Sequence, residues 1–308
     1  MSLSPPVEQS VPLELKILTY LEPRMNLNAS QQLTLHNLNK GLSGERKLIR
    51  LLQEQLSPNY FILHDFLFKI NGVEFQIDTL LIGGDKIYLI EVKNYEGDFF
   101  IKQSNWYSIS SGNEIRNPIH QLKRSELLLQ RMLQQSPYTF PIESYVVFIN
   151  SEFQLYHATT ELPIVFHAQI NRFIKKLNSN SFNQTNQHKK LAAFLNDQKH
   201  FWSDNKIFSF YNYEQLKKGI VCTSCFNFLT PINHNILVCS HCKSVEDLES
   251  ALMRSVLEFS TLFPDKKITT PFIYDWCQMN VSKKTIRRIL KKQMKVNGER
   301  KHTYYTFN

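Results

Sequence analysis

The sequence has 308 residues, 42% hydrophobic and 20% charged, which is typical of a soluble globular protein with one substantial domain and one or two small ones. It contains no apolar run of the length that a membrane-spanning helix needs, and its first residues lack the pattern of a secretory signal. We therefore expect a cytoplasmic protein with no membrane partner. Of the net charge of +9, the segment 264–308 supplies +8, with 11 Lys and Arg against 3 Asp and Glu, which favours a polyanionic partner such as nucleic acid.

The first half of the chain has the pattern of a mixed α/β domain. After a short apolar stretch at 13–21, a helix is expected to begin near Ser43, because apolar residues recur at helical spacing from Leu48 to Leu56. Strand-like runs then occupy 60–70, 73–82 and 86–93. The turn pairs Asn71-Gly72 and Gly83-Gly84 separate these runs and predict an antiparallel meander.

The elements that follow the meander alternate between helix and strand. Their expected order is a loop through Gly97 and Gly112, a helix at 117–135, a strand at 145–149, a further strand near 164–166, and a helix after it. The polar segment 178–188 is interpreted as a linker, and a second helix is expected at 189–195.

Two acids and a lysine lie on neighbouring predicted strands. Asp78 is on the second strand, and Glu91 and Lys93, two positions apart on the third, point to one face. Such a pair of carboxylates beside a lysine can hold Mg²⁺ or Mn²⁺ and a water next to a phosphate, with the carbonyl of Val92 as a further ligand. This D…ExK pattern is the metal-binding signature of a large class of nucleases. A solvated strand edge is the alternative interpretation.

Two helical residues complete the candidate site. Glu45 is aligned with the apolar stripe of the first helix, where an unpaired buried charge is costly, and a metal site would explain it. Gln121 lies in the first turn of the second helix, from which it can reach a metal-bound water or a phosphate. Together with Asp78, Glu91 and Lys93, these are the predicted catalytic residues.

Several segments resemble, in order, the nuclease-related domain known as NERD, of the PD-(D/E)xK nuclease superfamily. These are GLSGERKL, LHDF, FQIDTLLI, LIEVKNYEGDF and NPIHQLKR, and VPLELKILTYLEPRM upstream resembles the lead-in of bacterial members. The resemblance covers roughly residues 10 to 150. It implies a restriction-endonuclease-like core and cleavage of nucleic-acid phosphodiesters. By position it also implies metal-binding acids at Asp78 and Glu91, a catalytic lysine at Lys93, the helix glutamate at Glu45 and the helix glutamine at Gln121.

Four of the five cysteines form two C-x2-C pairs, and 13 residues separate the pairs. The spacing of Cys222, Cys225, Cys239 and Cys242 predicts a closed, structural Zn²⁺ site in a zinc ribbon rather than a catalytic zinc or disulfides. His241, inside the second knuckle, is expected at the surface or next to the ligand shell. Cys277 has apolar neighbours and is expected to be buried as a hydrophobic residue.

The basic C-terminal segment has the order of a winged helix-turn-helix. After a helix at 245–263, we expect a helix at 268–279, a turn with Ser282 as cap, a helix at 283–293 and a hairpin around Asn297-Gly298. Its candidate nucleic-acid-binding residues are Lys283, Lys284, Arg287, Arg288, Lys291, Lys292, Arg300 and Lys301. The alternative is a solvated charged face on a small helical domain.

These patterns together predict an α/β protein in five regions. They are a lead-in at 1–40, a nuclease-like domain at 41–175, a helical and linker region at 176–218, a zinc ribbon at 219–245 and a winged-helix-like domain at 246–308. The favoured function is a metal-dependent nuclease, with DNA as expected substrate, that the C-terminal region delivers to nucleic acid. One alternative is a non-catalytic DNA-binding regulatory or scaffold protein, and another makes the C-terminal region a protein-docking module.

Overall fold

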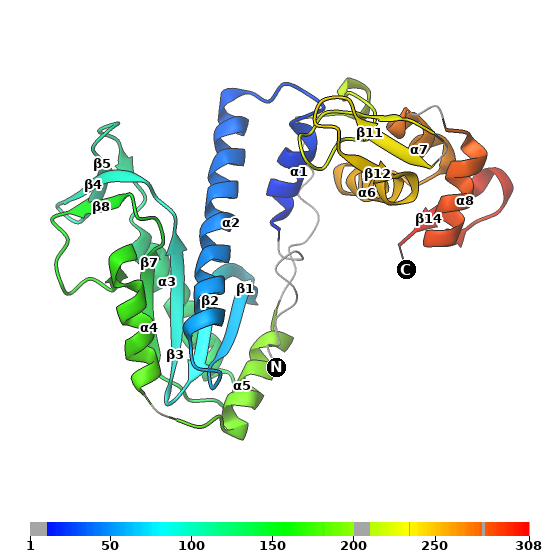
Figure 1. Cartoon of the computed structure of the whole chain (residues 1–308). Coiled ribbons are helices and arrows are strands. Elements are labelled where there is room, and N and C mark those ends of the chain that lie inside the picture. Colours follow the sequence, from blue (N-terminus) through cyan, green and yellow to red (C-terminus); the bar gives the residue numbers. More distant parts are fainter. Residues whose placement is uncertain (1–10, 181, 200–209, 234, 279–280, 308) are drawn as a thin grey trace. The chain divides into compact units, whose positions relative to one another are not determined.

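The computed structural model describes residues 11–180, 182–199, 210–233, 235–278 and 281–307. The chain divides into two compact units (Figure 1). One, here called the α/β unit, consists largely of His36–Ser203, and the other, the C-terminal unit, combines Pro12–Leu35 with Asp204–Asn308. Among the helices in the described ranges, none combines the length and the apolar character that crossing a membrane requires.

The α/β unit is built on a five-stranded mixed sheet with the order β1-β2-β3-β7-β9. Two antiparallel hairpins join β1, β2 and β3, so the predicted meander is confirmed. Strand β7 adds in parallel beside β3, and β9 adds in parallel beside β7. The five strands span Phe61–Ile70, Val73–Gly83, Lys86–Lys93, Ile142–Phe148 and Ile164–Val165.

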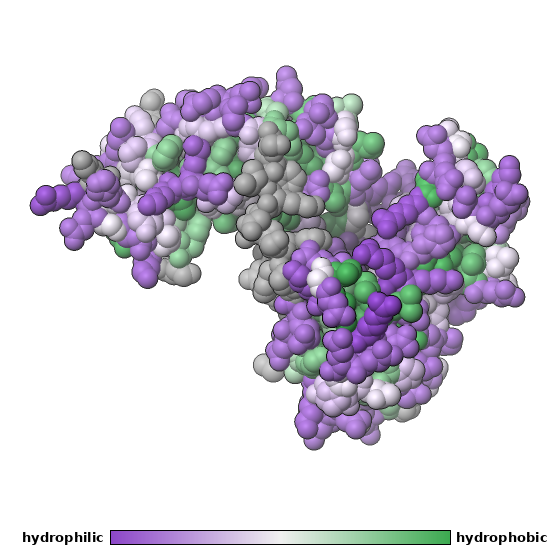
Figure 2. All heavy atoms as spheres, turned by 180° about the vertical axis from the view of Figure 1, so that it is seen from behind, coloured by the Kyte–Doolittle hydropathy of each residue, from purple (hydrophilic) through white to green (hydrophobic). Residues whose placement is uncertain are grey.

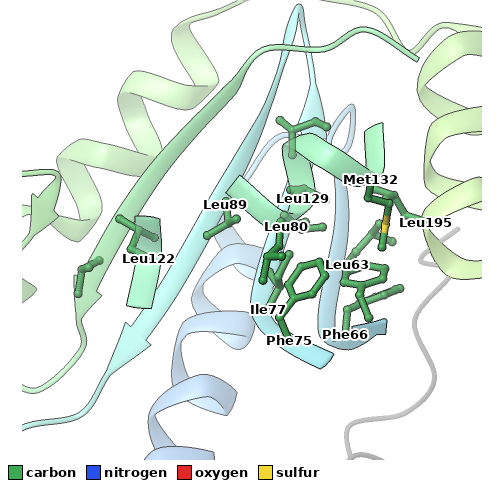
Figure 3. Close-up of a cluster of buried hydrophobic side chains, with 14 of the residues drawn as sticks. Leu63, Phe66, Phe75, Ile77, Leu80, Leu89, Leu122, Leu129, Met132 and Leu195 are labelled. Atoms are coloured by element: carbon green, nitrogen blue, oxygen red, sulfur yellow. The ribbon is translucent and has the colours of Figure 1, made fainter. Parts of the chain in front are cut away.

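Helices cover both faces of this sheet. On one face, α2 (Ala29–Gln55) and α4 (Ile170–Ser179) share a buried apolar cluster with the strands. On the other face, α3 (Pro118–Gln134) and α5 (Asn186–Asp197) do the same. Figure 3 shows part of this second cluster, whose labelled side chains are Leu63, Phe66, Phe75, Ile77, Leu80, Leu89, Leu122, Leu129, Met132 and Leu195.

Helix α2 begins at Ala29, well before the predicted start near Ser43. The missed start signal is a pair of reciprocal bonds, in which Asn28 accepts from the N–H of Gln31 and Gln31 accepts from the N–H of Asn28. Glycine at position 44 lets the helix pass close to the end of β3, because a Cβ there would lie 2.7 Å from the Cβ of Asn94. This close approach sets α2 beside the ends of β2 and β3.

Two other predictions for this unit were wrong. The expected loop after β3 forms a second sheet, ordered β6-β5-β4-β8, from strands too short to show a clear alternation. Its members are β4 (Gly97–Lys102), β5 (Asn105–Ser108), β6 (Glu114–Ile115) and β8 (Phe153–Tyr156). The expected linker at 178–188 is shorter than predicted, because Thr185 caps α5 and the helix begins at Asn186.

The C-terminal unit begins with a helix from the first part of the chain and a small sheet from the second. Helix α1 (Leu13–Leu21) contacts α6 (Leu248–Leu262). A three-stranded antiparallel sheet precedes α6 and consists of β10 (Leu229–Pro231), β11 (Ile236–Cys239) and β12 (Val245–Asp247). The helix predicted at 245–263 therefore starts later, at Leu248, where Asp247 accepts from the N–H of Ser250.

The last elements are α7 (Thr270–Cys277), α8 (Lys283–Gln293), β13 (Lys295–Asn297) and β14 (Tyr304–Thr306). Ser282 caps α8 by accepting from the N–H of Thr285, as predicted. The hairpin of β13 and β14 is present, but a turn of 3-10 helix at Arg300–His302 makes its connection longer than the expected Asn-Gly turn. Ile268 extends this pair by bridging to Tyr305.

Candidate functional site

The pairing of β2 with β3 sets two buried carboxylates side by side. The register joins Thr79 to Ile90, so Asp78 and Glu91 face each other one position further along. Asp78 is 8% exposed and Glu91 is 2% exposed. The Oδ2 of Asp78 accepts a hydrogen bond of 2.8 Å from the backbone N–H of Val92, which fixes the orientation of this carboxylate.

Lys93 connects the strand end to helix α3. Its Nζ donates to the Oε1 of Glu91 at 2.6 Å and to the Oε1 of Gln121 at 3.1 Å. Asn117 caps α3 by accepting a hydrogen bond from the N–H of Ile119. This cap fixes the start of the helix and therefore the position of Gln121. Burial alone would lower the pKa of Lys93, but the charge of Glu91 and the bond to it raise the pKa above its usual value. Lys93 therefore stays charged at neutral pH.

Glu45 approaches the same point from helix α2. Burial is the main cause that raises its pKa from 4.5 to about 7, and the charges of Asp65 and Glu91 raise it further. Burial, Glu91 and Glu45 likewise raise the pKa of Asp78 well above its usual value, against the effects of the Val92 N–H and Lys93. Several carboxylates held close together in a buried place repel one another, and a divalent cation among them would relieve this repulsion.

A cleft of about 430 Å³ opens over these residues. All five predicted catalytic residues line it, so the structure brings together every member of that set. Helix α2 also contributes Asn37, Lys40 and Gly41, and the segment after β3 contributes Asn94 and Tyr95. The cleft is therefore bordered by oxygen ligands for a hard cation and by amide and ammonium groups that can contact a phosphate.

Two polar residues of β1, which belong to the LHDF segment but are not among the predicted catalytic residues, lie beside this cleft. His64 and Asp65 line a small hollow together with Glu45 and Asp78. Asp65 has a positive φ of 51° and is left out of the ladder between β1 and β2, and its charge acts on Glu45. The available signal was the polar pair itself, which breaks the apolar run FILHDFLF.

The four paired cysteines converge in the C-terminal unit. Their sulfur atoms lie within 4.8 Å of one another, and among the described residues they form the one such group of three or more His, Cys, Asp or Glu ligands. The two loops have matching geometry, because the N–H groups of Phe226 and Lys243 donate to the carbonyls of Cys222 and Cys239, and both donors have positive φ. Thiolates in such paired turns fit a tetrahedral Zn²⁺.

The environment shifts the pKa values of these thiols in opposite directions. Against the backbone N–H of Cys242, which lowers it, burial and the thiol of Cys225 raise the pKa of Cys239 to about 11. The backbone N–H of Asn227, followed by its side-chain amide, lowers the pKa of Cys225 to about 5, so this ligand can be a thiolate at neutral pH. Cys222 and Cys239 are buried, whereas Cys242 is exposed, so the cluster lies between the small sheet and the surface. His241 is exposed and Cys277 is buried, the locations predicted for them.

The structure sorts the basic residues of α8 into two groups. Lys292 pairs with Glu249 of α6 at 2.8 Å, and the Nζ of Lys283 lies 4.9 Å from the ring centre of Tyr274. Lys284, Arg287, Arg288 and Lys291 are exposed on the side away from the buried Ile286, Ile289 and Leu290. Arg300 is exposed beyond β13, and the side chain of Lys301 lies outside the described residues.

Comparisons with known proteins point to one family for the segment that holds the cleft. Residues 40–149 match the family described as the nuclease-related domain, NERD. The uncharacterized protein pXO1-01 of Bacillus anthracis is 29% identical over 103 residues, which are 30% of this chain and 49% of that protein. The chain thus spans about half the length of the curated relative that it matches.

A crystal structure of protein VC1899 from Vibrio cholerae aligns over 58% of this chain and 57% of that chain. The identity is 11% and the TM-score is 0.27, which is too low for an argument from shape. The five predicted catalytic residues all lie inside the range of the family match. The segment 40–149, which holds these five residues, is therefore similar to the nuclease-related domain, NERD.

Proposed function

We propose that this protein is a metal-dependent nuclease of the PD-(D/E)xK type that hydrolyses phosphodiester bonds of nucleic acid, with DNA as the expected substrate. One observation carries the proposal: Glu45, Asp78, Glu91, Lys93 and Gln121 line a single cleft inside a nuclease-related domain. Three of these residues come from two strands and two from helices on opposite faces of the sheet, so their meeting is a property of the fold.

The donor set fits Mg²⁺ or Mn²⁺. Asp78 and Glu91 would hold the ion, with the carbonyl of Val92 as a further ligand, because these cations prefer carboxylate and carbonyl oxygens and keep some waters. When bound, such an ion offsets charge on a phosphate and lowers the pKa of a coordinated water. The raised pKa values of Asp78 and Glu45 support this proposal, because they reflect carboxylates held close together in a buried place.

Lys93 would act as a donor rather than as a base. Since its pKa is raised, its ammonium keeps the proton and can orient the attacking water or stabilise charge on the phosphate. Gln121 holds the ammonium from the side of α3. Burial raises the pKa of Glu45 to about 7 in the metal-free protein, and its charged form can accept a proton from the attacking water as a general base.

The C-terminal unit would deliver the α/β unit to nucleic acid. This is supported by the exposed row of Lys284, Arg287, Arg288 and Lys291, on a helix that is followed by a hairpin in the order of a winged helix-turn-helix. Cys222, Cys225, Cys239 and Cys242 would hold Zn²⁺ as a structural ion, because four protein ligands leave no open position for a reaction.

A cleavage assay tests the central proposal. The wild-type chain and the variants Asp78→Ala and Lys93→Ala would be incubated with single- and double-stranded DNA and RNA in Mg²⁺, Mn²⁺ or EDTA. Asp85→Ala and Lys86→Ala are matched controls, because these residues lie at the opposite end of the same hairpin. We expect metal-dependent cleavage that both site variants lose and both controls retain. Tight binding without cleavage under every condition would favour the non-catalytic alternative.

A further inference from the structure

Helix α3 carries basic residues on the side that faces away from the core. His120, Arg124, Leu127 and Arg131 follow each other at spacings of three and four residues, so they share one face of the helix, and all four are exposed. Lys123 is exposed beside them.

One acid of the same helix stands against these charges. Glu126 is the sole carboxylate in the sequence of α3, and it accepts a hydrogen bond of 2.5 Å from the hydroxyl of Ser144 on β7. The opposite side of α3 is fixed in the core by Leu122, Leu129 and Met132 (Figure 3). The helix therefore presents its basic side to solvent on a rigid support.

The basic side of α3 borders a shallow groove of about 370 Å³, here called the α3 groove. Its apolar part comes from Val73 and Leu127, which are 41% and 56% exposed, and its rim comes from His120, Lys123, Arg124 and Arg131. Figure 2 views the molecule from behind and shows apolar side chains on the surface that are bordered by strongly hydrophilic ones. A groove with an apolar floor and a cationic rim suits a ligand with regular negative charges and apolar faces.

The α3 groove and the catalytic cleft share the same two supporting elements. On α3, His120 lines the groove and its neighbour Gln121 lines the cleft. On β2, Val73 lines the groove and Gln76 lines the cleft. A strand of nucleic acid that lies in the groove would therefore enter the cleft without crossing to another part of the fold.

We propose that the α3 groove binds the sugar–phosphate backbone of the nucleic-acid strand that occupies the cleft, with the cations on phosphates and the apolar floor against sugars or an unstacked base. The inference rests on the proposed nuclease function and adds a substrate-binding surface within the α/β unit, apart from the basic helix α8. An acidic polypeptide is a competing occupant. We favour nucleic acid because the groove adjoins a cleft whose groups suit a phosphate.

A binding experiment without turnover tests this proposal. The full-length chain with Asp78→Ala, in EDTA, would be titrated with a fluorescently labelled single-stranded 20-mer at several salt concentrations, and Arg124→Gln/Arg131→Gln would be added to this parent. We expect the affinity to fall about tenfold and the salt dependence of log K to decrease by about 1.4, the value for two lost phosphate contacts on a single strand. Leu127→Glu should also weaken binding, because it places a negative charge on the floor.

Arg172→Gln/Lys175→Gln is the matched control, since it removes the same charge from exposed positions on α4, at the other face of the sheet. It should leave the affinity and the salt dependence near those of the parent. Equal losses in both double variants, or no loss in either, would overturn the proposal. Polyglutamate is titrated in the same way as a probe for an acidic polypeptide. If Arg124→Gln/Arg131→Gln kept its affinity for the oligonucleotide but lost binding to polyglutamate, the proposal would also be overturned, and the groove would be assigned to an acidic polypeptide. Because this assay measures binding alone, its outcome does not depend on whether the wild-type chain cleaves nucleic acid.

Discussion

The ammonium of Lys93 lies 2.6 Å from a carboxylate oxygen of Glu91, two positions earlier on the same strand, and the two side chains are 16% and 2% exposed. Residues two apart on a strand share a face, so this contact is a direct consequence of the E-x-K spacing. Its effect is that Glu91 has a cation beside it before any metal binds. The functions of the two residues can therefore be separated experimentally.

Lys93→Met should reduce cleavage by about 10²- to 10⁴-fold, the range for loss of a positioned proton donor or acceptor, while the binding of Mg²⁺ is retained or becomes tighter. Removal of the ammonium leaves the oxygens of Glu91 available to the ion. Glu91→Gln should instead lose both metal binding and cleavage. Calorimetric titration with Mg²⁺, beside single-turnover cleavage, measures the two effects. Lys86→Met on the same strand is the control, and loss of metal binding in Lys93→Met would contradict this division of functions.

Glu45 should make the metal-free protein less stable as the pH rises. Because its pKa is about 7 when folded and near 4.5 when unfolded, the folded state holds an extra proton between these values, and stability falls as the pH increases from about 4.5 to 7. Glu45→Gln should therefore raise the free energy of unfolding by about 1–3 kcal/mol at pH 8 in EDTA, and by little at pH 4.5.

Denaturant unfolding at both pH values, with and without Mg²⁺, measures this difference. We expect Mg²⁺ to reduce it, because the ion compensates the carboxylate charge. Glu54→Gln, an exposed position on the same helix, is the control. A Glu45→Gln variant that is less stable than the wild type at pH 8 in EDTA would contradict the buried-carboxylate account.

The central hairpins and the helix after them were predictable because their signals are local. The turn at Asn71-Gly72 and the apolar strands around it fix the antiparallel register, and that register sets Asp78 opposite Glu91. Asn117, which caps α3, and the proline after it allowed the start of this helix to be predicted, and with it the position of Gln121. The spacing of the cysteines was sufficient for their cluster.

What could not be predicted depends on contacts between distant segments. The position of Asp65 beside Glu45 follows from an irregularity in β1 that no turn residue announces. The α3 groove needs Val73 from β2 next to Leu127 from α3, residues 54 positions apart. The early start of α2 was missed for a different reason. Gly41 and Gly44 weaken the helical pattern in the sequence, whereas the true start of the helix is stabilised well before them by reciprocal hydrogen bonds between Asn28 and Gln31.

The two groups of basic residues on α8 should differ in their effects on nucleic-acid binding. Lys284→Gln/Arg287→Gln removes exposed charges, so the affinity for duplex DNA should fall and the salt dependence of log K should decrease by about 1.8, the value for two phosphate contacts on a duplex. Lys292→Gln removes a residue already paired with Glu249 and should change the slope by less than half as much. Fluorescence anisotropy over a range of salt concentrations measures both. Equal slopes for the wild type and Lys284→Gln/Arg287→Gln would exclude this face of α8.

The cysteine cluster should hold one Zn²⁺ per chain. Cys225→Ser should lose the ion and loosen β10 to β12, because the metal joins two turns that otherwise rest on a very small core. Cys277→Ser keeps all four ligands and should retain the zinc, although its buried site makes it less stable. Metal analysis of freshly purified protein measures the ion, and release with a thiol reagent shows which residues hold it. A wild-type chain without zinc, or zinc that persists in Cys225→Ser, would contradict the assignment.

Arg24 should be the most sensitive single position in the C-terminal unit. Its fully buried guanidinium donates to both carboxylate oxygens of Glu258, each at 2.7 Å, and to the carbonyls of Lys217 and Gly219. It also lies 4.0 Å over the ring of Trp276. Arg24→Met leaves a buried carboxylate without its cation, so it should destabilise this unit by about 3–5 kcal/mol.

Arg24→Met/Glu258→Leu should recover part of that loss, because no charge then remains uncompensated, although the two carbonyls still lack a donor. Hydrogen exchange followed by mass spectrometry can assign the change, since peptides of α6 and α7 should exchange faster in the single variant than in the double one. The exposed pair of Lys40 and Glu96 in the α/β unit gives the comparison, and Lys40→Met should cost less than about 1 kcal/mol. If the single and double variants proved equally unstable, the carbonyl bonds and the contact with Trp276, rather than the ion pair, would be what holds Arg24 in place.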